Sequence, residues 1–91
     1  MATFVIETYL SRARAADLGR SIDRLRTAIN RLADGQEVRV RPVPRHIRSF
    51  YVADDEMAYH MVEVGSAEAA AVLSAAAELV PTRIVEAEAP P

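Results

Sequence analysis

The apolar residues of this chain follow two repeat lengths, and the order in which they alternate constrains the fold most strongly. Residues 3–10 (TFVIETYL) are rich in β-branched and aromatic residues and alternate with the period of a strand. Residues 15–33 then carry one apolar stripe with helical spacing. The stripe consists of Leu18, Ile22, Leu25, Ile29 and Leu32. It covers about two heptads, which is too short for a free coiled coil, so it predicts a helix packed on a sheet. Gly35 follows where a left-handed residue commonly ends a helix.

The rest of the chain predicts three more strands, with one helix between the last two. Residues 45–52 (RHIRSFYV) and 56–64 (EMAYHMVEV) have strand character and are separated by a short acidic turn. Ser66 suits the N-cap of an alanine-rich helix that Pro81 ends, and residues 82–88 form the last strand.

One further segment, residues 37–43 (EVRVRPV), alternates until the prolines begin. Proline cannot donate to a strand ladder, so we expect this segment on a sheet edge, with a bulge or kink at Pro42 and Pro44.

The order strand–helix–strand–strand–helix–strand predicts an α+β fold, the ferredoxin-like α/β plait (βαββαβ). In this fold an antiparallel sheet carries both helices on one face. The usual strand order, 4-1-3-2, places the first and third strands in the centre. The 91 residues are enough for a single domain, 1–91, with residues 88–91 as a frayed tail.

Composition excludes several classes of protein. The chain has no cysteine, which excludes disulfides, thiolate metal sites and cysteine nucleophiles. The N terminus lacks the basic start of a signal peptide, and no apolar run approaches the ~18 residues of a membrane span. We therefore expect a cytoplasmic protein without a membrane partner. No phosphate loop, nucleophile motif or cofactor fingerprint is present, so an enzyme is the less favoured class.

The strand faces indicate which side chains the uncovered side of the sheet presents. Glu7 is expected there, because burying an unpaired carboxylate beneath the helices is costly. The bulky residues Met57, Tyr59 and Met61 suit the helix side, together with Phe4, Ile6, Leu10, Ile47 and Tyr51. The predicted open face then comprises Val5, Glu7, Tyr9, His46, Arg48, Phe50, Val52, Ala58, His60, Val62 and Val64. Such an apolar face usually marks an interface, so we expect a homodimer through the open sheet.

Three stretches, FVIETYL, IRSFYVADDE and PTRIVEAE, resemble a family of small bacterial proteins classified mainly as a domain of unknown function. Some members of that family are described as nickel-binding. The similarity extends over nearly the whole chain and implies a dimeric ferredoxin-like fold. The chain departs from the family pattern where members often carry cysteines, at the positions of Ala58 and His60, and RPVPRH looks like an insertion. A thiolate site is therefore lost or rebuilt with harder ligands.

These observations predict a site for nickel or another divalent transition metal, formed by His60, Glu7 and His46. Imidazole with carboxylate suits such metals, although no HxH or HxxxH spacing is present. The alternative for the same residues is an interface pair, with Glu7 bound to Arg48. Two other functions stay open: a dimeric plait that binds or transforms a small organic molecule, and a structural interaction module.

Two charged groups have simpler interpretations. The acidic turn at 54–56 (DDE) is typical of a solvated hairpin, and the arginines Arg20, Arg24 and Arg31 of an ion-paired helix surface. The basic first half raises nucleic-acid binding as a possibility. We expect no such partner, because Glu7 occupies the part of the sheet on which RNA-binding plaits stack bases.

Overall fold

Four antiparallel strands form one sheet in the order β2-β3-β1-β4. The strands are β1 (Ala2–Tyr9), β2 (Arg45–Val52), β3 (Met57–Val64) and β4 (Arg83–Ala87). This computed structural model describes residues 1–35 and 38–88. The order is the predicted 4-1-3-2 arrangement, and the βαββαβ plait is confirmed.

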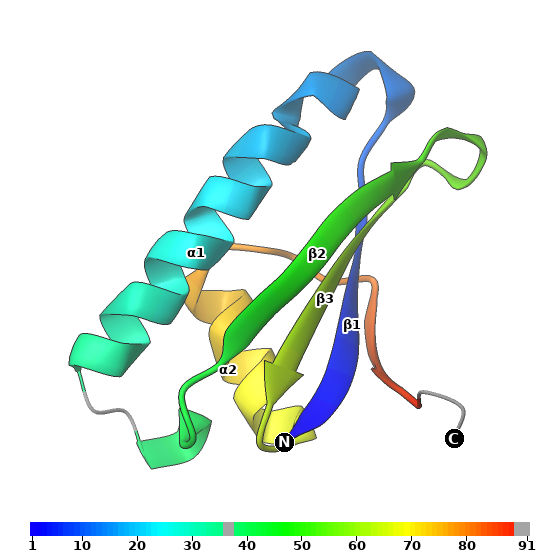
Figure 1. Ribbon diagram of the computed structural model, residues 1–91. Coiled ribbons are helices and arrows are strands. Elements are labelled where there is room, and N and C mark those ends of the chain that lie inside the picture. Colours follow the sequence, from blue (N-terminus) through cyan, green and yellow to red (C-terminus); the bar gives the residue numbers. More distant parts are fainter. Residues whose placement is uncertain (36–37, 89–91) are drawn as a thin grey trace.

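Both helices lie on one side of the sheet (Figure 1). They are α1 (Leu18–Asp34) and α2 (Ala67–Ala76), and three short 3₁₀ segments join the elements: η1 (Arg12–Asp17), η2 (Val38–Val40) and η3 (Ala53–Asp55). The molecule measures 37 × 32 × 17 Å. A thickness of 17 Å accommodates one sheet and one helix layer, so no helix or strand of the described residues covers the second face of the sheet.

The helix boundaries follow local chemistry, with one exception. At the start of α2, the Ala69 N–H donates to Ser66 Oγ at 3.1 Å, as expected of an N-cap serine. At the end of α1 the predicted left-handed Gly35 is wrong. Gly35 keeps right-handed angles (φ −77°) and its N–H donates to the Arg31 carbonyl at 2.8 Å, so the chain leaves α1 without reversing its hand.

The predicted edge strand at 37–43 is also wrong in its described part. Residues 38–40 form η2, which packs against α2 and buries Val40. The Arg41 N–H donates to the Val38 carbonyl at 3.1 Å, a local turn hydrogen bond. Pro42 and Pro44 cannot donate to a ladder. After η2 the chain passes so close to Gly65 that a Cβ there would lie 3.0 Å from the Arg41 carbonyl oxygen. A larger residue at 65 would therefore force the Arg41 backbone to shift, so glycine is favoured at this crossing.

The core fills the space between helices and sheet. Phe4 and Ile6 from β1 and Val62 and Val64 from β3 meet Leu25 of α1 and Leu73 of α2. The α2 alanines Ala69 and Ala70 are fully buried, and their small side chains let the helix approach the sheet closely. The α1 stripe packs inward as predicted, with Leu25 at its centre.

Candidate functional site

The sequence-based faces are right for β1 and wrong for β3. Phe4 lies opposite Val62 and Ile6 opposite His60 in the register of the two strands. Directly paired residues share a face, so His60 and Val62 lie on the helix side, and both are fully buried. Ala58 and Val64 share that side, while Met57, Tyr59 and Met61 face outward. The prediction placed the bulky residues inward because of their size. The alanine-rich α2 instead packs close to the sheet, and the space beneath it holds smaller side chains.

A β-bulge in β2 brings His46 to the same side. The pairing register shifts between His46 and Arg48, so the alternation inverts there. His46 then lies opposite Val62 and Ser49 opposite His60. The predicted outward position of His46 is therefore wrong, and Ile47, predicted inward, is 39% exposed.

The bulge creates a chain of three polar side chains beneath the helices. His46 Nε2 lies 2.9 Å from Ser49 Oγ, which lies 2.6 Å from His60 Nδ1. The hydroxyl can donate to one imidazole while it accepts from the other. His60 Nε2 has no hydrogen-bond partner among the described residues. Sequence reasoning did not find Ser49, because only the bulge places it between the two rings.

Burial favours the neutral form of both histidine side chains, His46 and His60. Desolvation, with a smaller contribution from nearby His46, lowers the pKa of His60 to about 4. The pKa of His46 is lowered by burial and by the Arg26 charge, against a backbone hydrogen bond with Arg48 that raises it. Both rings are therefore uncharged at neutral pH.

The predicted metal set is not assembled, because Glu7 lies on the other face of the sheet. Its carboxylate accepts a 2.9 Å hydrogen bond from Arg83 Nε, and not from Arg48. Within residues 1–35 and 38–88 no group of three or more His, Cys, Asp or Glu side chains is placed to hold a metal ion. Two imidazoles joined through a serine do not fit a nickel centre, and metal binding stays a prediction.

The open face is apolar, with ion pairs among its hydrophobic residues. Phe50 and Tyr59 stack across β2 and β3, with ring centroids 5.2 Å apart. Phe50 is 42% exposed and Tyr9 64%. The pairs Glu7–Arg83 and Arg45–Glu63 satisfy charges on the same face.

A cavity of about 340 Å³ opens where the end of β1 meets η1, the start of α1 and the turn after α2. Three arginines line it, Arg14, Arg20 and Arg24, with the hydroxyls of Thr8, Ser11 and Ser21. Two carboxylates, Asp17 and Glu78, and four residues with large apolar surfaces, Tyr9, Leu10, Leu79 and Val80, complete the lining. A volume near 300 Å³ is at the small end of the usual range for small-molecule sites.

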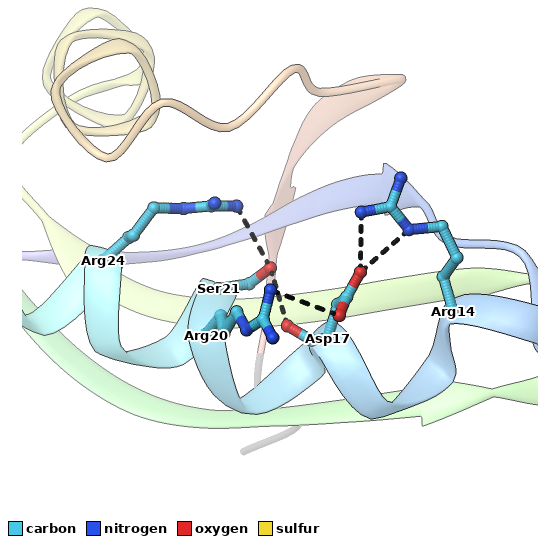
Figure 2. Close-up of polar contacts among 5 residues, drawn as sticks. All are labelled: Arg14, Asp17, Arg20, Ser21 and Arg24. Carbon is cyan, nitrogen blue, oxygen red and sulfur yellow. Dashed lines mark hydrogen bonds and ion pairs between the residues drawn. The ribbon is translucent and has the colours of Figure 1, made fainter.

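The arginines of this cavity differ in how fully they are paired, as Figure 2 shows. Arg14 donates through Nε to Asp17 Oδ2 at 2.8 Å, and its Nη2 lies 2.8 Å from the same oxygen. Arg20 Nη1 lies 3.9 Å from Asp17 Oδ1. Among the described residues, the Arg24 guanidinium has one hydrogen bond, a 3.5 Å contact with Ser21 Oγ. Most of its donors therefore remain free for a ligand.

The hairpin of β2 and β3 holds one wall of the cavity in place. Leu10 N–H donates to the Glu56 carbonyl at 2.9 Å, and Tyr51 Oη donates to the Leu10 carbonyl at 2.6 Å. Arg12 N–H donates to the Glu56 carboxylate at 2.9 Å, and Arg12 Nη1 to the Ala53 carbonyl at 3.2 Å. The acidic turn thus positions η1, a role that its sequence did not indicate.

Sequence reasoning took the helix arginines as a solvated surface and missed the cavity. Arg20 is ion-paired, as the predicted helix surface requires, with Asp17 as its partner, but Arg14 lies closer to Asp17. The missing information was the path of the chain after α2, which brings Glu78, Leu79 and Val80 opposite the arginines.

Comparison of the chain with protein-family models, with curated proteins and with solved structures finds no match. No helix in the described part of the chain is long and apolar enough to cross a membrane.

Proposed function

We propose that this chain is a homodimeric binding protein for a small organic anion, held in the arginine-lined cavity. The observation that carries the proposal is the convergence of Arg14, Arg20 and Arg24 on one cavity. Guanidinium groups bind carboxylates and phosphates through paired, charge-assisted hydrogen bonds. Arg24 supplies the least committed of the three groups.

The rest of the lining favours a carboxylate with an apolar body. Tyr9 is 64% exposed and Val80 is 86% exposed, and both line the cavity. Covering exposed apolar side chains with a ligand is favourable, because it removes apolar surface from water. An inorganic anion such as phosphate would leave them in water. We assign binding and no reaction, because no serine in the described cavity lining is paired with a histidine that could act as its base.

Titration of ¹⁵N-labelled protein with 3-phenylpropionate tests this proposal. We expect saturable shifts of the amides that line the cavity. Arg24→Gln should weaken binding about tenfold, the size expected when a charged hydrogen-bonded group is lost. Arg26→Gln is the matched control, since Arg26 is an exposed α1 arginine outside the cavity lining. The proposal fails if no carboxylate gives saturable shifts, or if both variants weaken binding equally. Binding of phosphate alone would contradict the apolar part of it.

The homodimer rests on the open face. A sheet within an outline of 37 × 32 Å can supply the ~800 Å² per partner that stable interfaces bury. Aromatic and methionine side chains of the kind enriched in interface cores lie on this face, namely Phe50 on the edge strand β2 and Tyr59 and Met61 on the central strand β3. The ion pair Glu7–Arg83 already neutralises its charges, so covering the face leaves no lone carboxylate there.

Sedimentation equilibrium tests this part of the proposal. Phe50→Asp places a charge in the aromatic pair of the open face and should give a monomer. Ala71→Asp places the same charge on the exposed side of α2 and should leave the dimer intact. A wild-type chain that is monomeric at micromolar concentration would contradict it. The cytoplasmic location expected from the sequence completes the proposal, and cell fractionation tests it.

A further inference from the structure

Glu78 occupies a backbone conformation that is normally left to glycine. After α2, the Leu79 N–H donates to the Ser74 carbonyl and the Glu78 N–H to the Ala75 carbonyl, both at 3.0 Å. This pattern ends a helix with a left-handed residue, and Glu78 has φ 58°. Side chains other than glycine and asparagine are unfavourable there, because Cβ crowds the neighbouring carbonyl. A glutamate that persists at such a position invites a functional explanation.

A second left-handed glutamate among the described residues shows what a structural explanation looks like. Glu56 has φ 49°, and its carboxylate accepts the 2.9 Å hydrogen bond from Arg12 N–H that holds η1. Within residues 1–35 and 38–88, no hydrogen bond or ion pair engages the Glu78 carboxylate. The two backbone hydrogen bonds that end α2 favour the left-handed conformation, but no described contact explains why its side chain is a glutamate.

Glu78 lies where two cavities adjoin. The arginine-lined cavity and a second one of about 240 Å³ between α1 and the end of α2 share two lining residues, Arg24 and Glu78. The second cavity exists because Ala28, Ala76 and Ala77 leave space between the helices. Arg24 and Glu78, a cation and an anion, thus line both cavities.

We propose that Glu78 selects ligands that carry an ammonium group together with a carboxylate. This inference rests on the proposed function and narrows it to the class of amino acids and related zwitterions. A carboxylate beside an anion site repels simple organic acids, and it attracts those whose own cation faces it. Selectivity then arises from the penalty on competitors as well as from the new contact.

Matched ligand pairs test this inference. L-phenylalanine and 3-phenylpropionate differ only in the α-ammonium, and 6-aminohexanoate and hexanoate carry the same difference at a greater separation of charges. In at least one pair, the amine-bearing member should bind wild-type protein about five- to tenfold more tightly, the effect of a partly exposed ion pair. In Glu78→Gln the ratio should fall to about one.

Glu78→Gly separates ligand selection from folding. It should lose the same selectivity while its melting temperature rises, because glycine relieves the left-handed strain. The inference is overturned if the selectivity ratio survives in both variants, or if wild-type protein binds the two members of each pair equally. Equal binding would leave the anion-site proposal intact and would contradict only the proposed role of Glu78. If no member of either pair binds, both proposals fail.

Discussion

Replacing His60 tests the buried polar chain through its effect on acid stability. His60 is fully buried, and its Nε2 atom has no hydrogen-bond partner among the described residues. Protonation would place a charge in a desolvated position beneath the helix layer, near the His46 ring. The folded chain therefore resists protonation, and the pKa of His60 is lowered from 6.5 to about 4.

The sign of the pH effect follows from linkage. Between pH 6.5 and 4 the unfolded chain binds a proton at residue 60 and the folded chain does not, so unfolding becomes easier as the pH falls. A difference of about 2.5 pKa units corresponds to about 3 kcal/mol, which is lost in full below pH 4. About 2 kcal/mol of this is lost between pH 7 and pH 5. A domain of this size has only about 5–15 kcal/mol in total.

Urea denaturation at pH 7, 6 and 5 measures the effect. His60→Asn keeps an acceptor for Ser49 and does not titrate, so its unfolding free energy should fall by about 2 kcal/mol less than that of wild-type protein over this range. Subtracting the two curves removes the contribution of the carboxylates. His46→Asn is the companion variant. It removes the nearby ring that helps lower the His60 pKa, so its pH dependence should lie between the other two. Parallel curves for wild type and His60→Asn would show that His60 titrates normally and is not sealed beneath the helices.

Three further predictions concern the sheet, the crossing at Gly65 and the metal. Glu7→Ala should lower the unfolding free energy by about 1 kcal/mol in urea denaturation, because its partner Arg83 is largely exposed and regains water. No change would mean that the pair contributes nothing. Gly65→Ala should cost about 1–3 kcal/mol, since the new Cβ meets the Arg41 carbonyl at 3.0 Å. By contrast, Gly19→Ala in α1 meets no atom within 4 Å and should stabilise by about 0.5–1 kcal/mol. Nickel titrated into tag-free protein tests the metal prediction by calorimetry: a sharp endpoint would support it, and the absence of stoichiometric heat would contradict it.

Periodicity was enough to predict the architecture, because each segment matches one repeat length. The alternation of β1 and the stripe of α1 each permit one buried face, and both predictions are confirmed. The face of β3 was harder, since both of its sides carry large apolar residues. A shift of one residue exchanges the two sides, and only the pairing of Ile6 with His60 decides between them.

The candidate site was beyond prediction for a related reason. The relation between His46 and His60 depends on one extra residue in β2, the bulge at Ile47, and no single-strand pattern reveals it. The arginine cavity depends on long-range contacts between η1, α1 and the turn after α2. Arg14, Arg20 and Arg24 look like any exposed helix surface until that turn is in place.

The two proposed surfaces lie on opposite layers, and this separation has consequences for how they would work together. The dimer would cover the side of the sheet that holds Phe50 and Tyr59. The anion cavity opens on the helix side, where Arg24 and Glu78 line it. Association through the sheet would therefore leave both cavities of the dimer open to solvent, and neither would need a residue from the partner.

Tyr9 is the point of contact between the surfaces, since it stands at the end of β1 on the open face and also lines the cavity. Any influence of ligand binding on dimerisation would have to pass through that end of β1, which the hairpin already holds through Leu10.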